Sequence, residues 1–468
     1  MNLRAFQYLA LLWGGIPVSL TCNAQNKTGN RPNIILIMAD DMGWGDVGFN
    51  GNTKIKTPGL DQMARAGVVF DRFYSGSAIC SPTRGSCITG RNPYRYGIYF
   101  ANEGMMKKEE ITISEVAKKV GYTTAHFGKW HLGTFSKTIP DGRRGGTGAA
   151  YSPPWENGFD QCFSTEQAVP TWDPMKNQTF KNPTRYWTGP GQYANENLEG
   201  DDSRVMMDRV IPFIRNAVKN DTPFLAVVWF HAPHSPVVAG PRYLKMYHQF
   251  DENKQHYYGC ITAMDEQITR LRQELQQLQV EDNTLVTFCS DNGPAGEGGG
   301  TLQHPGARQQ GETGGFRGRK GVLYEGGLRV PGILVWPSHF KGGEHTSFPA
   351  VTSDYFVTIL GIWGFELPKR PYDGMNLMPA LDRKITERPG FIGFQIPTQQ
   401  SIVTQNYKLI TPDKKVYELY YLPEDKYEKN DIAAAHPDMV EQMKKELSQW
   451  IESCKKSNKG EDYKDEED

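Results

Sequence analysis

The chain has 468 residues, of which 22% are charged and 38% hydrophobic, and its formal net charge is −1. This is an ordinary globular composition with enough apolar residues for a large core, and the length suits one large domain plus a smaller one. Because the charge is nearly balanced, no overall field points to nucleic acid or an anionic membrane as a partner, so a small anion would need a local cationic pocket.

The N-terminal segment has the pattern of an export signal. Arg4 precedes an apolar run that ends at Leu20, and Cys22-Asn23-Ala24 supplies a small-residue cleavage site. We therefore expect residues 1–24 to be a signal peptide and the protein to be periplasmic or extracellular. The run is too short for a membrane span. A lipoprotein site at Cys22 is the alternative, which the preceding Ser19-Leu20-Thr21 fits poorly.

The first apolar run of the mature chain, Asn33–Met38, predicts a buried parallel strand. It leads to Asp40 and Asp41, whose adjacent carboxylates repel each other and lose solvation next to a buried strand. A hard cation would remove both costs. For such a pair alone, a solvated acidic turn is the more common interpretation.

The stretch Cys80–Gly90 predicts a short helix. Pro82 suits a first helical turn, and Gly90 can close the helix in the left-handed conformation. Cys80 would then lie at the positive end of the helix dipole, where an anion or a thiolate is favoured. Arg84, one turn later, adds a cation on the same side. Without further context, a half-buried cysteine beside a surface arginine would be the ordinary interpretation.

The next predicted strand, Tyr122–Phe127, is followed by Gly128-Lys129-Trp130-His131-Leu132-Gly133. On an extended segment Lys129 and His131 would face the same way. Residues 134–201 follow without clear periodicity and form a long loop that we expect on the catalytic face. Its aromatic residues could stack on sugar rings or pack the loop onto the domain, and the sequence favours neither; they are Trp155, Trp172, Tyr186 and Trp187.

Two further strands end in polar residues. Phe224–Phe230 leads to His231 and His234 on a stiff, proline-rich loop, where isolated histidines are usually structural. A long helix and the strand Leu285–Cys289 lead to Ser290-Asp291-Asn292-Gly293, which repeats the pattern of the first strand. Two such strand ends side by side would supply three carboxylates and one amide oxygen, a set suited to Ca²⁺ or Mg²⁺.

The alternation of apolar strands and helices predicts a doubly wound α/β fold, a mostly parallel sheet with helices on both faces and the site at the carboxyl ends of strands. After Pro368, predicted strands at 403–410 and 416–422 and a helix from Pro437 indicate a small α+β subdomain. We assign residues 30–367 to the catalytic domain, 368–457 to the C-terminal subdomain and 458–468 to a charged, disordered tail.

Four segments together resemble the formylglycine-dependent sulfatases of the alkaline-phosphatase superfamily. Cys80–Gly90 resembles the signature Cys-x-Pro-Ser/Thr-Arg-x-x-x-Leu-Thr-Gly, with Ile88 in place of leucine, and Gly128–Gly133 matches the second signature. His234 matches a histidine before x-Pro, and Lys320–Pro331 resembles Lys-Gly-x-x-x-Glu-Gly-Gly-x-Arg-x-Pro. The order of the segments resembles that of a bacterial exported carbohydrate sulfatase.

The resemblance implies that a maturation enzyme converts Cys80 to formylglycine and that one divalent ion, usually Ca²⁺, is bound. It also implies a covalent mechanism in which a hydroxyl of the hydrated aldehyde attacks sulfur. Its metal ligands map onto Asp40, Asp41, Asp291 and Asn292. Charge on the sulfate would be offset by Arg84, Lys129 and Lys320. His234, with Lys320, would protonate the departing alcohol, and His131 would take a proton from the second hydroxyl to expel sulfate.

Substrate choice is a separate expectation. Lys129, His234 and Lys320 would bind the sulfate group, with His231 less securely placed, and the loops at 134–201 and 294–310 would contact the sugar. Trp172 and His304 are the individual candidates in those loops. An exported sulfatase with aromatic loops fits a sulfated carbohydrate. The alternatives are a broad arylsulfatase, a phosphodiesterase or phosphonate hydrolase on the same fold, and a glycan-binding protein, which would need a broken set of site residues.

Overall fold

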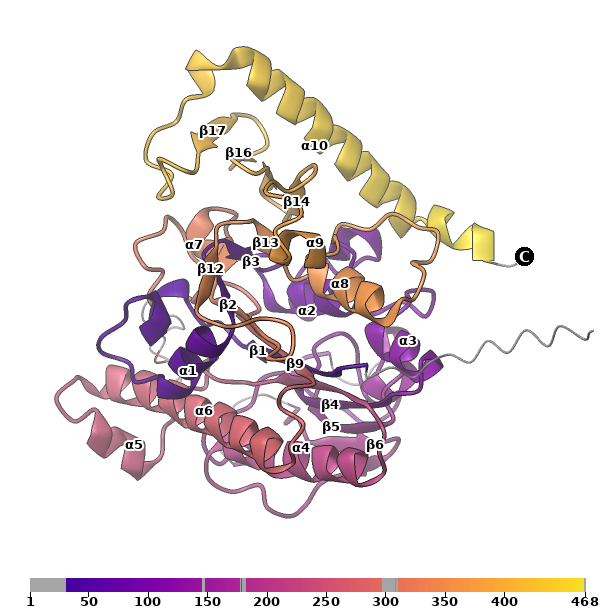
Figure 1. The fold of residues 1–468 in the computed structure, drawn as a ribbon, viewed down its shortest axis with the longest axis vertical. Coiled ribbons are helices and arrows are strands. Elements are labelled where there is room, and N and C mark those ends of the chain that lie inside the picture. Colours follow the sequence, from indigo (N-terminus) through magenta and orange to yellow (C-terminus); the bar gives the residue numbers. More distant parts are fainter. Residues whose placement is uncertain are drawn as a thin grey trace, which may run out of the picture.

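The computed structural model describes residues 31–144, 148–176, 178, 182–296, 308 and 310–466. The expected signal segment, Cys22 and His304 lie outside these residues. The described chain forms one large sheet of ten strands, a three-stranded sheet and a separate four-stranded antiparallel sheet (Figure 1). The predicted fold class, a mostly parallel α/β sheet with a small C-terminal subdomain, is confirmed. None of the described helices is both long and apolar enough to cross a membrane.

The centre of the large sheet is parallel, and its strands are buried except at the first residues of β4 and β5. Its strands lie in the order β9 (Thr284–Ser290), β1 (Asn33–Ala39), β8 (Phe224–Trp229), β4 (Thr123–Lys129) and β5 (Gln161–Thr165). Ile34 of β1 lies between Leu225 and Leu285, so the neighbouring strands run in register. The edges are short strands: β2 (Val68–Phe70), β11 (Gly332–Val335) and β12 (Glu344–Thr346) on one side, β6 (Trp187–Gly189) and β7 (Gln192–Tyr193) on the other.

Helices cover both faces of this sheet, because alternate residues of each central strand are apolar on opposite sides. Ile35 and Ile37 face a core formed with α1 (Pro58–Ala66), α4 (Asp202–Lys219) and α6 (Glu252–Gln277). Leu36 and Met38 face a second core, formed with α2 (Cys80–Thr89), α3 (Ile113–Lys119) and α8 (Asp354–Trp363). Short helices lie at 241–246 (α5), 325–328 (α7) and 378–381 (α9).

Two apolar segments, 68–74 and 330–336, would each be expected from the sequence to form a single strand, but the structure divides both regions. A turn at Asp71-Arg72 separates β2 from β3 (Phe73–Tyr74), which leaves the large sheet and pairs with β10 (Arg329–Val330) and β13 (Ala350–Val351). Pro331 separates β10 from β11, as expected for a residue that has no N–H for a ladder. The three-stranded sheet therefore joins the segment before Cys80 to the segment after Lys320.

The C-terminal subdomain is a meander of β14 (Ile392–Gln395), β15 (Gln400–Val403), β16 (Tyr407–Thr411) and β17 (Glu418–Tyr421), crossed by α10 (Pro437–Asn458). The predicted single strand at 403–410 is a hairpin whose turn lies between β15 and β16. The tail also differs from its expectation: Glu461–Glu466 form a 3₁₀ helix, and Asp462 pairs with the buried Arg91 at 2.7 Å.

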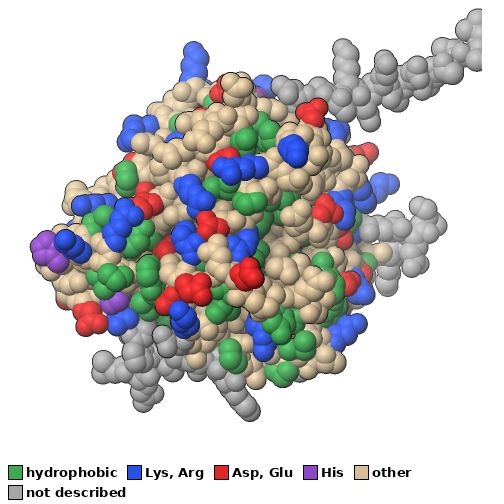
Figure 2. All heavy atoms as spheres, turned by 90° about the horizontal axis from the view of Figure 1, so that it is seen from below, with side chains coloured by type: hydrophobic (Ala, Val, Ile, Leu, Met, Phe, Trp, Pro, Cys, Tyr) green, Lys and Arg blue, Asp and Glu red, His purple; other side chains and the backbone are tan. Residues whose placement is uncertain are grey.

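Charged side chains of both signs are interspersed on the face seen from below (Figure 2). This agrees with the near-zero net charge, and it leaves anion binding to local groups of cations.

Candidate active site

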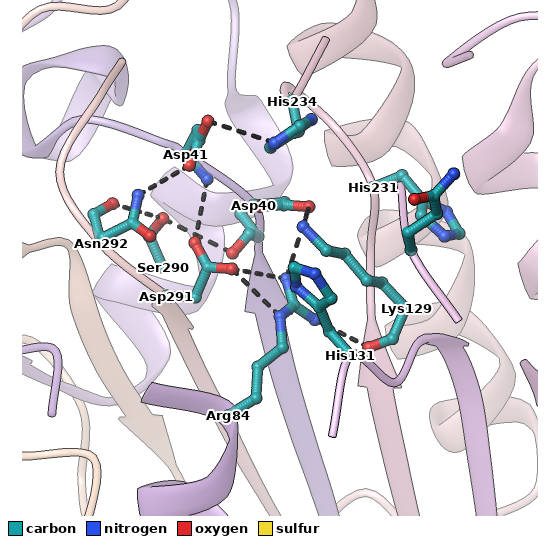
Figure 3. A network of polar contacts seen from close by, with 12 residues as sticks. Asp40, Asp41, Arg84, Lys129, His131, His231, His234, Ser290, Asp291 and Asn292 are labelled. Carbon is teal, nitrogen blue, oxygen red and sulfur yellow. Dashed lines mark hydrogen bonds and ion pairs between the residues drawn. The ribbon is translucent and has the colours of Figure 1, made fainter. Parts of the chain in front are cut away.

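The predicted metal ligands meet at the carboxyl ends of β1 and β9 (Figure 3). Ala39, the last residue of β1, lies opposite Ser290, the last residue of β9, so the polar residues that follow both strands are adjacent. The backbone N–H of Asp41 donates to Asp291 Oδ1 at 3.0 Å, and the Asn292 amide donates to Asp41 Oδ1 at 2.7 Å. All of these side chains are buried.

This cluster is suited to an oxygen-coordinated cation. One ligand atom each of Asp40, Cys80 and Asp291 lies within 4.8 Å of the others, and the same holds for Asp40, Asp41 and His234. Asp40 Oδ1 and Asn292 Oδ1 are buried acceptors that receive no hydrogen bond from any described residue. Buried oxygens of this kind are normally satisfied, and a hard cation would satisfy both. The predicted residues therefore fit a Ca²⁺ or Mg²⁺ ion.

Two lysine side chains reach into the acidic cluster from separate elements. Lys129, at the end of β4, places Nζ 2.7 Å from Asp40 Oδ2, and Lys320 places Nζ 2.5 Å from Asp41 Oδ1. Burial alone would raise the pKa of Asp41, but Lys320, His234 and Lys129 hold it well below its usual value. Burial and the neighbouring Asp40 raise the pKa of Asp291 to about 6.

The helix at Cys80 forms as predicted. Ile79 is extended and Cys80 is the first helical residue, while Gly90 closes α2 with φ +70°. Every residue of α2 is buried. The expectation of a favoured thiolate is wrong for this structure, because burial raises the pKa of the Cys80 thiol, even though Lys129 and Lys320 act in the opposite direction. Desolvation outweighs the helix dipole here.

Arg84 lies within the cluster and contacts its acids. Nε and Nη2 donate to Asp291 Oδ2 at 3.1 and 2.6 Å, and Nη1 donates to the backbone oxygen of Lys129 at 2.9 Å. The side chain is fully buried beside the ring of Trp229. Each of its nitrogens thus already binds a protein oxygen. The structure places Arg84 where it orients Asp291, and its role in offsetting charge on the sulfate stays a prediction.

His131 reaches the site by a different backbone route from the predicted one. The strand ends at Lys129, and His131 has φ +61°, so the segment is not extended there. Such a conformation is strained for a residue other than glycine and is typical of functional sites. Nε2 of His131 lies 3.0 Å from Asn102 Oδ1, and Nδ1 is buried without a partner. Burial and the nearby Lys129 hold the pKa of His131 well below its usual value.

The two histidines after β8 have different surroundings (Figure 3). His234 Nε2 lies 3.7 Å from Asp41 Oδ2, and burial together with Lys129 lowers the pKa of His234 to about 3. His231 is fully buried, with Nδ1 2.8 Å from Asp202 Oδ2 and Nε2 2.7 Å from Thr165 Oγ1. Because both ring nitrogens of His231 are occupied, its predicted role in substrate binding is not supported.

Most of the aromatic candidates in the loop at 134–201 pack against other parts of the protein. The ring of the half-buried Trp172 lies so close to Gly240 that a Cβ added to this glycine would be 2.1 Å from the ring. The backbone of Trp172 also forms an isolated antiparallel β-bridge with Asp201. Tyr186 and Trp187 are fully buried. These contacts favour the packing role over sugar stacking. His304, the candidate of the second loop, lies outside the described residues.

Some residues at the site had no signal in the sequence. Asn102 contacts His131 from a turn that carries no motif. Arg144 donates to the backbone oxygens of His131 at 3.4 Å and Glu103 at 3.5 Å, and its buried Nε and Nη1 have no acceptor among the described residues. Glu166 follows β5 and is fully buried, and no donor in the described part of the chain bonds to either of its carboxylate oxygens. Burial raises the pKa of Glu166 to about 8.

Comparison with curated proteins gives relatives of one enzyme class. The chain is 32% identical over 382 residues to N-acetylgalactosamine-6-sulfatase of Homo sapiens, which covers 77% of this chain and 68% of the relative. It is 30% identical over 373 residues to arylsulfatase A of Homo sapiens, over 75% of this chain and 68% of the relative.

Solved structures share the fold. The crystal structure of Ps i-CgsB has a TM-score of 0.77 at 26% identity, over 90% of this chain and 93% of that one. Its complex with k-i-k-neocarrahexaose gives a TM-score of 0.76 at 25% identity, with the same shares covered. The sulfatase family profile matches residues 32–365, a range that contains every residue placed at the site above. The chain therefore belongs to the sulfatase family and is a sulfuric ester hydrolase.

Proposed function

We propose that this enzyme removes sulfate from a sulfated carbohydrate, and that Cys80, matured to formylglycine, is its nucleophile. The observation that carries the proposal is the position of Cys80, at the buried start of α2 within reach of both strand ends and both lysines. A relative named N-acetylgalactosamine-6-sulfatase and a structural neighbour in complex with k-i-k-neocarrahexaose support the substrate class.

Asp40, Asp41, Asp291 and Asn292 would hold one divalent cation, Ca²⁺ in preference to Mg²⁺, and the two unpartnered oxygens support this assignment. When bound, the cation would supply positive charge that orients the sulfate and favours loss of a proton at residue 80. Arg84 fixes Asp291 by two hydrogen bonds, so the ligand set is oriented before the ion binds.

Lys129 and Lys320 would stabilise negative charge on the sulfate oxygens during transfer, because their ammonium groups already lie at the acidic cluster. His234 would act together with Lys320, whose ammonium group has a proton to give, in protonating the departing alcohol, and the position of His234 Nε2 3.7 Å from Asp41 Oδ2 supports this assignment. His131 has one ring nitrogen fixed by Asn102, which leaves Nδ1 to take the proton that releases sulfate. In its hydrated form, formylglycine at residue 80 would offer the two hydroxyls that this sequence of transfers needs.

We further propose that the loop at 134–201 selects the sugar, and that Arg144 is its principal contact. Arg144 lies against the backbone of His131, and two of its nitrogens have no acceptor among the described residues. The neighbouring Glu166 is neutral near pH 7 because its pKa is raised to about 8, so it leaves the charge of Arg144 available. A guanidinium in this position suits a hydroxyl or an acidic group next to the scissile ester.

The runner-up activities are a broad arylsulfatase and a phosphonate or phosphate ester hydrolase. A phosphonate monoester hydrolase of Agrobacterium radiobacter shares the fold, with a TM-score of 0.63 at 19% identity over 91% of this chain and 96% of that one. That likeness concerns the fold alone, and the sulfatase relatives favour the sulfate ester. Export by the N-terminal segment and maturation by a formylglycine-generating enzyme remain parts of the proposal.

The test is a turnover screen of matured enzyme. It compares defined sulfated mono- and disaccharides with an aryl sulfate, a phosphate diester and a phosphonate monoester, and Cys80→Ala is the control for background hydrolysis. We expect the highest kcat/KM for one sugar sulfate. A preference for the phosphorus esters, or equal rates for all sulfates, would refute the proposed substrate class.

A further inference from the structure

A buried lysine of the C-terminal subdomain lies behind the loop that carries Lys320. Lys408, on β16, is fully buried and places Nζ 3.0 Å from Glu325 Oε1 and 2.8 Å from Glu428 Oε1. Glu325 belongs to the catalytic domain, at the start of α7, whereas Glu428 follows β17. One ammonium group therefore joins a carboxylate from each part of the molecule.

The same carboxylates fix the backbone and the neighbours of α7. Glu428 Oε2 accepts the backbone N–H of Glu325 at 2.7 Å. Glu325 Oε2 accepts the hydroxyl of Tyr74 at 3.1 Å and lies 3.4 Å from Arg329 Nη1. Burial alone would lower the pKa of Lys408, but Glu428 and Glu325 raise it, so the ammonium form is the one that holds the two carboxylates together.

The loop between Gly318 and α7 is short and closely held. Gly318 and Gly321 have φ +78° and +88°, which other residues adopt only with strain. Gly321 N–H donates to the backbone oxygen of Ala78 at 2.9 Å, two residues before Cys80. The C-terminal subdomain also bonds this loop directly, because Gln399 Oε1 accepts the N–H of Leu323 at 2.7 Å and Glu418 Oε2 accepts the hydroxyl of Tyr324 at 2.8 Å.

Apolar packing follows the same path. Cys80, Leu323 and Leu328 belong to one buried cluster with Tyr74 and with residues of the C-terminal sheet, namely Phe394, Val403, Ile410 and Tyr420. Figure 1 shows α7 on the side of the catalytic domain that faces this sheet. Only four residues separate Lys320 from Glu325, and two of them, Leu323 and Tyr324, are buried, so a shift of Glu325 would be passed along this segment to Lys320.

From these contacts we infer that Lys408 is a positioning residue for catalysis: by holding Glu325 against Glu428, it keeps Lys320 at Asp41 and beside Cys80. The inference rests on the proposed sulfate-binding role of Lys320. Without the ammonium group, two buried carboxylates would face each other with Arg329 as the remaining cation in contact with Glu325, and the start of α7 would move or take up a proton. The C-terminal subdomain then contributes to turnover although none of its residues named here contacts the acidic cluster.

The test is a double-mutant cycle. Lys408→Met removes the charge and keeps the length of the side chain, and its effect on kcat/KM is measured alone and together with Lys320→Ala. We expect a loss of about tenfold in the wild-type background and a much smaller loss when Lys320 is absent, since residues that act through one another are not additive. Lys408→Arg, which keeps the charge, should retain most of the activity.

Arg388→Met is the matched control. Arg388 is also a buried cation before the C-terminal sheet, but its side chain pairs with Asp354 at 2.7 Å and donates to the backbone oxygen of Pro349, away from the Lys320 loop. Any loss of kcat/KM that Arg388→Met causes should be the same in the wild-type enzyme and in Lys320→Ala. If Lys320→Ala turns over too slowly to assay, the same proteins are compared by their dissociation constants for inorganic sulfate.

Glu428→Gln is the second variant in case Lys408→Met does not fold, and it should show the same non-additivity with Lys320→Ala to a smaller extent. Equal fold-losses in both backgrounds, for Lys408→Met or for Glu428→Gln, would overturn the positioning role and leave Lys408 a stability residue only. If the matured wild-type enzyme hydrolyses no sulfate ester at all, it is the proposed function that fails, so the two failures are distinguishable.

Discussion

At the scale of single residues, the site is an alternation of buried acids and buried cations. Lys129, Lys320 and Arg84 each contact a carboxylate of the cluster, yet Asp40 Oδ1 and Asn292 Oδ1 still lack a partner. Leaving two acceptors unsatisfied is costly, about 1–3 kcal/mol each in free energy of unfolding. A bound cation would recover this cost, so metal and stability should be linked.

We therefore expect chelation to lower both activity and thermal stability. Treatment with a strong chelator should abolish turnover, and Ca²⁺ or Mg²⁺ should restore it and raise the melting temperature with metal concentration. Asp291→Asn should weaken this metal-dependent rise. Thoroughly chelated, metal-analysed protein that retains full activity would contradict the prediction.

A second prediction at this scale concerns Cys80. Burial raises the pKa of its thiol, so the unmodified side chain is a poor nucleophile near pH 7. Protein made without a maturation enzyme should be folded, able to bind sulfate and mostly inactive. Peptide mass spectrometry across Cys80 should show that turnover rises in proportion to the fraction converted to formylglycine. Robust multiple turnover by protein whose Cys80 is wholly unmodified would refute the mechanism.

At the scale of elements, sequence reasoning located the strand ends well, because long buried apolar runs are unambiguous and the predicted metal ligands and His234 each follow one of them. Sequence reasoning failed where contacts between distant segments decide the local structure. The segment 68–74 divides between two sheets, and the alternation of Lys129 and His131 did not reveal the positive φ of His131. Asn102 and Lys408 had no local signal, since their partners lie 29 and 83 residues away.

The loop at 134–201 gives a prediction about specificity. Arg144→Ala should lower kcat/KM for the preferred sugar sulfate by about tenfold or more, the scale of one lost charge-assisted hydrogen bond, and spare an aryl sulfate. Its neighbour Arg143 is exposed, so Arg143→Ala is the matched control and should leave both substrates unchanged. If Arg144→Ala reduces both activities in parallel, Arg144 has a structural role instead.

A contact between α6 and the start of α1, away from the site, gives a prediction about how stability depends on pH. Asp265 of α6 accepts the N–H groups of Gly59 and Leu60 at 2.8 and 2.7 Å, capping α1 from outside. Burial raises the pKa of Asp265 from 3.8 to about 7. Between those values the folded state holds this proton and the unfolded state has lost it, so the contribution of Asp265 to stability falls as pH rises.

The amide of Asp265→Asn cannot ionise, so the stability of this variant should lack the pH-dependent contribution of Asp265. Measured by denaturant unfolding, the stability of wild type relative to Asp265→Asn should decrease from pH 4.5 to pH 7.5, while kcat is unchanged. A difference that stays constant over this range would show that the carboxyl does not hold its proton in the folded protein.

At the scale of the whole molecule, the C-terminal subdomain is joined to the catalytic domain by several buried polar contacts. Arg388 pairs with Asp354 of α8, Asp373 accepts from Arg95 and from Trp450 of α10, and Lys408 reaches Glu325. Cys80 itself packs in a cluster shared with the C-terminal sheet. Breaking one such buried pair leaves an uncompensated charge, at a cost of about 3–5 kcal/mol.

Because these contacts cross the boundary in several places, we expect the two parts to unfold together. Circular dichroism and tryptophan fluorescence should give coincident denaturant transitions for the wild type, since coincidence of probes is the mark of a single cooperative unit. Arg388→Met should lower the midpoint while the two probes remain coincident, because the Asp373 and Lys408 contacts still hold the subdomain in place.

Arg388→Met combined with Asp373→Asn should separate the transitions, with the tryptophan signal that includes Trp450 changing first. Two resolved transitions in the wild-type protein would show that the C-terminal subdomain is an independent unit, and its connection to the Lys320 loop would then be too weak to influence catalysis.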